Sequence, residues 1–136
     1  MSTFIVQAKN NSMKELNDMK GKTIAVQLGT VQESFSRSIE GAAVKTFQKF
    51  DDCVREVILG RADASLMDIP VAKKFLEQRD FEGEIAAAFK QEITGAGKAM
   101  AIHLEEKDFL NAVNKALQEI IDSGELQDLQ KKWFNN

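Results

Sequence analysis

This sequence of 136 residues has few of the residue types that build disulfides, metal centres or nucleophilic sites. It contains one cysteine (Cys53), one histidine (His103), one proline and no tyrosine. A single cysteine cannot form an internal disulfide, and one histidine beside one cysteine leaves no Cys/His metal cluster. We therefore expect no metal and no other cofactor, and we interpret both residues as packing residues.

The sequence also has no strong excess of charge of one sign and no long apolar run. The formal net charge is −3, and the Lys and Arg residues are scattered among acidic ones, so we expect no nucleic-acid partner. No apolar run approaches the roughly 20 residues that span a bilayer. The N-terminus lacks the charged and apolar segments of a signal peptide.

Short apolar segments alternate with amphipathic ones along most of the chain. This pattern is typical of strand and helix units around a largely parallel sheet, so we predict an α/β fold. Helices are expected after Ser12, which forms a capping box with Glu15, after Thr30, after Asp51 or Asp52, and over residues 69–78. Strands are expected over residues 3–7, 23–28, 43–47, 62–67, 84–89 and 99–103, with a turn at Thr94-Gly95-Ala96-Gly97 before the last one.

The pattern changes after residue 103. Apolar residues then recur at helical spacing, and Gly124 interrupts them, which predicts two amphipathic helices with no strand between them. We expect residues 1–103 to form the α/β unit and residues 104–136 to form these helices. The apolar positions are Leu110, Val113, Leu117, Ile120, Leu126, Leu129 and Trp133.

The segment 22–33 is the most informative one for function. A buried strand stops at Gly29, and Thr30 with Glu33 forms a capping box that opens the next helix. In such a box the Thr30 hydroxyl accepts from the amide of Glu33, and the Glu33 carboxylate accepts from the amide of the cap residue. The remaining amides of the first turn favour a carboxylate or phosphate at this end of the strand.

Asp68 is the second candidate, because it follows a buried strand at the edge where open α/β sheets bind ligands. Its position before Ile69-Pro70 is also that of an ordinary helix N-cap, and this interpretation is the stronger one from local sequence alone. An α-amino acid, however, needs both an anion-binding turn and a carboxylate. Gly29 and Asp68 supply this pair if their strands end at one edge.

Other chemistry has less support. Ser34, Ser36 and Ser38 have no base partner and no nucleophile-elbow glycines, so covalent catalysis is not indicated. The pair Asp51-Asp52 lacks the spaced oxygen ligands of a calcium loop. We therefore predict that the protein is not an enzyme.

Three motifs together carry a family resemblance. Residues 16–30 (LNDMKGKTIAVQLGT), residues 60–64 (GRADA) followed by Asp68, and the ending 126–134 occur in an order that resembles the polar amino-acid solute-binding proteins of ABC importers. The match runs through nearly all of the chain. It implies a periplasmic-binding-protein-like lobe with two added C-terminal helices, within a two-lobed fold that traps its ligand.

The resemblance also implies roles for individual residues. Thr30, Val31 and Gln32, after the Gly29 turn, match the groups that hold the ligand α-carboxylate in that family, and Asp68 matches the partner of the α-ammonium. Gln27 and Met67 match positions that line the ligand side chain. The implied partners are an amino acid and, for the full-length protein, the membrane permease of the transporter, at an extracytoplasmic location.

The sequence departs from the family at its start, because it begins where the second lobe begins. Half of a clamp buries little of a ligand, so we expect weak or undetectable binding by this chain alone. The apolar face of the two C-terminal helices then needs a cover. Either the helices fold back on the sheet, or they pack on a second copy in a homodimer, with exchange of elements around residues 95–97.

Two alternative functions remain open at this point. The same lobe fold occurs, by resemblance, in sensor or protein-interaction modules and in a few enzymes that dehydrate cyclic acids. An enzyme requires an acid or base that faces the substrate, and Asp68 is the single strand-end candidate with no partner visible in the sequence.

Overall fold

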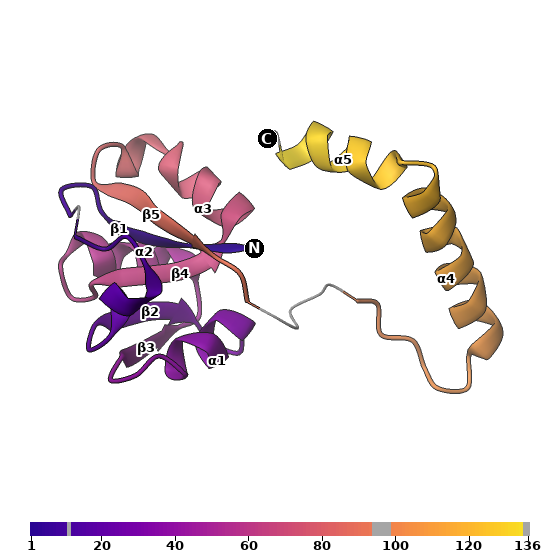
Figure 1. Cartoon of the computed structure of the whole chain (residues 1–136), viewed down its shortest axis with the longest axis horizontal. Helices are drawn as coiled ribbons and strands as arrows, with labels where there is room; N and C mark the ends of the chain where they lie inside the picture. The colour runs from indigo at the N-terminus through magenta and orange to yellow at the C-terminus, as the bar shows by residue number, and fades with distance from the viewer. Residues whose placement is uncertain (11, 94–98, 135–136) are drawn as a thin grey trace. The chain divides into compact units, whose positions relative to one another are not determined.

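The computed structural model describes residues 1–10, 12–93 and 99–134. The chain divides into two units, residues 1–96 and 97–136, each of which is described by itself. The first unit contains the sheet, and the second contains the last two helices (Figure 1). The predicted turn at 94–97 lies outside the described residues, and the predicted division after residue 103 stays a prediction.

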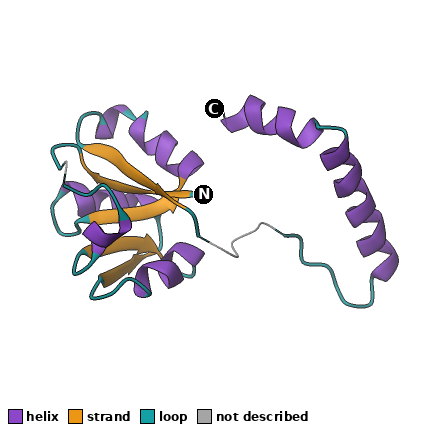
Figure 2. Cartoon of the chain, in the orientation of Figure 1, coloured by secondary structure: helices purple, strands orange, loops and turns teal. Residues whose placement is uncertain are grey.

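Five strands form one sheet in the order β3-β2-β4-β1-β5, as labelled in Figure 1. Figure 2 shows the strands in orange and the helices in purple. β2 pairs in parallel with β3 and with β4, whereas β1 is antiparallel to both β4 and β5. All strands except β1 therefore run in one direction, which confirms the predicted mostly parallel α/β sheet. The strands are β1 (Ser2–Gln7), β2 (Thr23–Gln27), β3 (Ala43–Phe47), β4 (Ala64–Asp68) and β5 (Ile85–Gln91).

The strand register brings the segments of interest to one edge. Ile24 is opposite Ala64 and Ala25 is opposite Ser65 in the parallel pair, so β2 and β4 reach their carboxyl ends side by side. On the other side of β4, the antiparallel register places Ser2 opposite Asp68. The start of β1 and the ends of β2 and β4 thus meet at this edge.

Helices cover both faces of the sheet because its central strands are apolar on both sides. α2 (Phe50–Ile58) and α3 (Ile69–Leu76) pack over one face, where Ile5, Ala25 and Met67 are buried. α1 (Val31–Arg37) and the 3₁₀ helix η1 (Leu16–Met19) pack over the other. A short 3₁₀ helix, η2 (Arg79–Phe81), precedes β5.

Two predicted helix starts are wrong. Ser12 does not cap a helix, because its amide and hydroxyl both bond to Asn10 Oδ1. The box belongs instead to Glu15 and Asp18, and the amides of Lys14 and Glu15 that bond to Asp18 hold the pKa of its carboxyl below the usual value.

The second wrong start concerns α2, whose N-cap is Lys49 rather than Asp51 or Asp52. Both acids lie inside the first turn of the helix, where a negative charge is favourable next to the helix dipole. At the other end, Gly60 has a φ of +69° directly after the C-cap residue Leu59, as the sequence predicted.

The predicted strand at Ala99–His103 is also wrong, because these residues form neither a strand nor a helix. Strand geometry needs a hydrogen-bonded neighbour, and none of the five described strands pairs with this segment. The sequence Ala-Met-Ala-Ile at residues 99–102 is apolar enough for a strand, but a sequence pattern alone does not provide a neighbouring strand to pair with.

The second unit consists of α4 (Lys107–Asp122) and α5 (Glu125–Phe134), joined at Gly124 with a φ of +81°. This confirms the two predicted helices and the break between them. Apolar side chains on both helices are exposed, among them Leu110, Leu117, Leu129 and Trp133. Within the described part of the chain, no helix is both long and apolar enough to cross a membrane.

Candidate functional site

The turn after β2 has the helix-capping geometry that the sequence predicts at Thr30. Gly29 has a φ of +76°, which L-residues rarely adopt, and it is exposed. Thr30 is the N-cap of α1, and its Oγ1 accepts from the amide of Glu33 at 3.2 Å. The same hydroxyl donates to the carbonyl of Gln27 at 2.7 Å and so fixes the turn to the end of β2.

The second half of the predicted capping box is displaced by one residue. Glu33 Oε2 accepts from the amide of Gly29 at 2.7 Å, and not from that of Thr30. This bond is the main reason that the pKa of the Glu33 carboxyl lies below its ordinary value, and the hydrogen bond from Arg37 lowers that pKa further. The Gly29 amide is therefore occupied. The amides of Val31 and Gln32 lie in the first turn, where the helix supplies no acceptor.

Asp68 is held by two side chains from other elements. Its Oδ1 accepts from Gln32 Nε2 on α1 at 2.8 Å and from Ser2 Oγ on β1 at 3.2 Å. Gln32 Nε2 also donates to Ser2 Oγ at 3.1 Å, which closes a triangle of hydrogen bonds. Ser2 and Gln32 are 2% and 4% exposed, whereas Asp68 itself is half-buried.

Asp68 also occupies the N-cap position of α3, but its side chain does not cap that helix. The backbone has the extended conformation of a cap, with a proline in the first turn, while the carboxylate forms no capping bond. The local interpretation as a simple N-cap is thus correct for the backbone and wrong for the side chain. The carboxylate is directed to α1 and β1.

The other predicted site residues differ in their exposure. Val31 is 44% exposed at the start of α1, and Gln27 is half-buried with its Nε2 bonded to the carbonyl of Gln48 at 3.0 Å. Met67 is fully buried in the core beneath α2 and α3. Its side chain does not reach the edge, contrary to the prediction that it lines the ligand, because alternation along β4 turns it to the opposite face from Asp68.

Ser2 is the member of the site that sequence reasoning missed. It is the first residue of β1, and its role depends on the antiparallel pairing of β1 with β4. No local motif in the sequence signals that pairing. Leu28, which is 50% exposed beside the Gly29 turn, was not predicted as an apolar neighbour of the site either.

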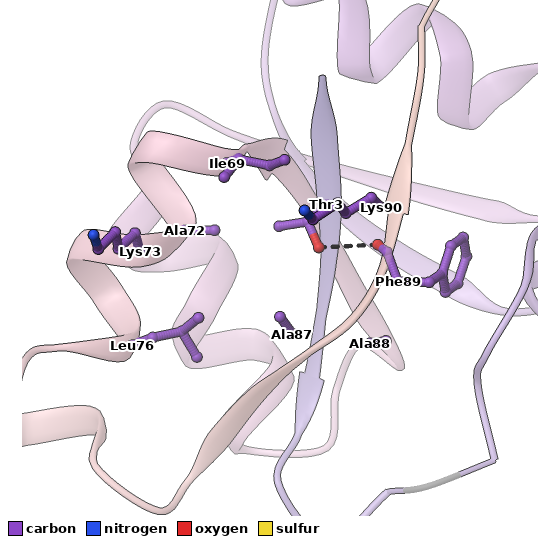
Figure 3. A pocket seen from close by; sticks show the side chains of 9 residues that line it. All are labelled: Thr3, Ile69, Ala72, Lys73, Leu76, Ala87, Ala88, Phe89 and Lys90. Carbon is purple, nitrogen blue, oxygen red and sulfur yellow. Dashed lines mark hydrogen bonds between the residues drawn. The ribbon is translucent and has the colours of Figure 1, made fainter. Parts of the chain in front are cut away.

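A hollow lies elsewhere, between α3 and β5 (Figure 3). It has a volume of about 370 Å³ and forms where the β1–β5 pairing shifts register between Thr3 and Ile5. Thr3 Oγ1 donates there to the carbonyl of Phe89 at 2.9 Å. Because Thr3 and Ser2 are consecutive on β1, the hollow and the Asp68 triangle lie on opposite faces of the sheet. Its lining residues are Thr3, Ile69, Ala72, Lys73, Leu76, Ala87, Ala88, Phe89 and Lys90.

Comparison with known protein families decides what kind of protein this edge belongs to. Residues 4–136 match the bacterial extracellular solute-binding proteins, family 3. The chain belongs to this family. The match covers both the α/β unit and the two C-terminal helices, in agreement with the resemblance derived from the three sequence motifs.

Individual members of family 3 show the same relationship. The arginine-binding extracellular protein ArtP of Bacillus subtilis is 34% identical over 135 residues, which cover 96% of this chain and 52% of ArtP. An ancestral arginine-binding protein, solved bound to arginine, superposes with a TM-score of 0.80 at 29% identity and covers 98% of this chain and 60% of its own. The chain thus spans about half to three fifths of these relatives.

A solved structure of a single domain is also similar to this chain. The crystal structure of domain 2 from TmArgBP superposes with a TM-score of 0.58 at 29% identity, covering 65% of this chain and 94% of that domain. ArtP and the ancestral protein are both described as arginine-binding proteins, and this chain shares their family.

Proposed function

We propose that this chain provides the second-lobe face of the amino-acid site in the solute-binding component of an ABC importer. Asp68 takes the α-ammonium of the ligand, and the backbone at Thr30 and Val31 takes its α-carboxylate. Recognition is non-covalent. Membership of family 3 and the arginine bound by the ancestral relative support the ligand class.

The observation that carries the proposal is the shared edge of β2 and β4. The parallel register brings the Gly29 turn and Asp68 to the same end of neighbouring strands, and Gln32 links the two directly through its bond to Asp68. An exposed turn that favours anions thus stands beside a carboxylate that favours cations. These are the two charges of an α-amino acid. Gln27 and Val31, beside them, are suited to contact the ligand side chain.

Titration calorimetry with arginine, lysine, histidine, glutamine and cystine tests this function. We expect weak binding of at least one of them, and a loss of about tenfold or more in Asp68→Asn, since a charge-assisted hydrogen bond is lost. Asp80→Asn, an exposed carboxylate on η2, serves as the matched control and should bind like the wild type. Absence of heat from the whole panel, or equal heat in Asp68→Asn, contradicts the proposal.

We also propose an extracytoplasmic location and, for the complete transporter, a membrane permease as partner. Family 3 consists of extracellular proteins, and ArtP carries that description as well. Expression of the protein from its native gene, followed by fractionation of the cells and detection of the chain, tests the location. Recovery in the cytoplasmic fraction alone contradicts it.

The exposed apolar face of α4 and α5 leads us to propose a homodimer through these helices. Leu117 is 42% exposed and Trp133 is 69% exposed, and contiguous apolar surface of this kind marks an interface. Sedimentation should show a dimer whose population falls in Leu117→Lys. The matched control, Lys115→Ala on the same helix, should leave it unchanged. A monomer at the highest concentration measured contradicts the proposal.

A further inference from the structure

The hydrogen-bonded triangle of Ser2, Gln32 and Asp68 joins three elements that are far apart in the sequence. The three sides measure 2.8, 3.1 and 3.2 Å. Gln32 extends from the first turn of α1, Ser2 begins β1, and Asp68 ends β4. Both donors meet the same atom, Oδ1 of Asp68, from two sides.

The burial of the three side chains is unequal. Ser2 and Gln32 are 2% and 4% exposed, so neither side chain reaches a solute at the edge, whereas half-buried Asp68 does. The resemblance places Gln32 among the residues around the ligand carboxylate, but its amide nitrogen is directed at Asp68. The geometry therefore distinguishes the half-buried carboxylate from the two buried side chains that bond to it.

We infer that Ser2 and Gln32 are positioning residues that fix the Asp68 carboxylate in its ammonium-binding orientation before the ligand arrives. This inference rests on the proposed function of Asp68. Two donors on Oδ1 restrict rotation of the carboxylate, and a group that is already oriented loses less conformational freedom when it binds. Supporting residues of this kind set the precision of a site.

The hydrogen-bonding capacity of each member matches the triangle. The Gln32 amide nitrogen has two protons, one for Asp68 and one for Ser2, and the Ser2 hydroxyl accepts the second while it donates its own proton to Asp68. Replacement of either residue by an apolar one removes a donor from Oδ1. Replacement of Ser2 by threonine keeps the hydroxyl and tests whether the donor, and not the residue volume, is what matters.

The first measurement needs no ligand. In the full chain labelled with ¹³C-aspartate, the Asp68 carboxyl resonance is assigned from its absence in Asp68→Asn. We expect it to move in Ser2→Ala and in Gln32→Met, and to stay near its wild-type position in Ser2→Thr. Gln27→Met is the matched control, because Gln27 lies at the same edge but bonds to the carbonyl of Gln48. An unchanged resonance in folded Ser2→Ala and Gln32→Met overturns the inference. If circular dichroism shows that Gln32→Met does not fold, Ser2→Ala decides.

The second measurement compares an amino acid that binds with its analogue lacking the α-amino group. In Gln32→Met the preference for the amino acid should fall by about threefold to tenfold, as expected when one hydrogen bond no longer orients the charge. If Gln32 has only a structural role, the affinity for both ligands falls by the same factor in Gln32→Met, and that result overturns the inference. If the wild type binds neither ligand, the proposed function fails, while the carboxyl resonance still decides the role of Ser2 and Gln32.

Discussion

Gln32 and Asp68, 36 positions apart in the sequence, are joined by a 2.8 Å hydrogen bond from Nε2 to Oδ1. This bond connects the first turn of α1 to the end of β4, so the Gly29 turn and the carboxylate are parts of one hydrogen-bonded edge. The relative positions of the first-turn amides of α1 and the Asp68 carboxylate are fixed by this connection.

Removal of the Asp68 carboxylate should destabilise the protein as well as weaken binding. Asp68→Ala leaves the donors of Ser2 and Gln32 buried without this acceptor, so the free energy of unfolding should fall by about 1–3 kcal/mol. Asp68→Asn keeps an oxygen acceptor and should lose less. Urea unfolding followed by circular dichroism measures both variants. Equal losses in the two variants would show that the triangle does not depend on the acceptor.

Two buried serines should respond in opposite ways to replacement by alanine. Ser65 is fully buried on β4, and its hydroxyl has no hydrogen-bond partner among the described residues. Ser65→Ala should therefore leave the free energy of unfolding unchanged or raise it by up to about 1 kcal/mol. Ser2→Ala removes a bonded hydroxyl and should lower it by about 1 kcal/mol. Thermal and urea unfolding of Ser65→Ala and Ser2→Ala measure both effects. A lower free energy of unfolding in Ser65→Ala than in Ser2→Ala would contradict the prediction.

The thiol of Cys53 should make stability depend on pH in the alkaline range. Burial, with a smaller contribution from Asp52, raises the pKa of this thiol from 9.0 to about 12. Between these two values the unfolded chain releases the proton and the native protein retains it. The contribution of this thiol to the free energy of unfolding is therefore fully present below pH 9, and it is lost as the pH rises towards about 12. The free energy of unfolding, measured across this range, should fall more steeply in the wild type than in Cys53→Ala. Parallel curves for the two proteins would contradict the prediction.

Gly29 should be sensitive to substitution through its backbone alone. Its φ is +76°, and a Cβ atom built at this position meets no atom within 4 Å. Gly29→Ala should therefore lower the free energy of unfolding by about 1–2 kcal/mol because of the left-handed conformation, without a steric clash. Gly29→Asn should cost less, since asparagine tolerates this region better. Denaturant unfolding of the two variants tests the order, and a more stable alanine variant would contradict it.

The sequence was sufficient for the fold class and for both halves of the candidate edge. Apolar runs that end at Gly29 and at Asp68 predicted two strands, and the parallel register then placed their ends together. The capping of α1 by Thr30 was also predictable, because the hydroxyl bond to the amide of Glu33 is local.

Long-range contacts were the part that local pattern could not supply. Ser2 and Gln32, which both bond to Asp68, come from β1 and α1, 66 and 36 positions away in the sequence. The segment Ala99–His103 shows the same limitation, since its apolar alternation fits a strand but no described strand pairs with it. A local detail also differed from the prediction, because the Glu33 carboxylate accepts from the amide of Gly29. Met67 was predicted to line the ligand, but its side chain is buried in the core beneath α2 and α3. The sequence does not show which residues of β4 point to which face of the sheet.

The most direct test of the central claim is a ¹H–¹⁵N correlation titration of the chain with a basic or polar amino acid, which detects weak binding residue by residue. We expect the amide resonances of Thr30, Val31 and Asp68 to move together with one dissociation constant, and these shifts to be lost in Asp68→Asn. Shifts confined to the hollow between α3 and β5, at Ala72, Ala87 and Phe89, or no shifts at all, would contradict the central claim.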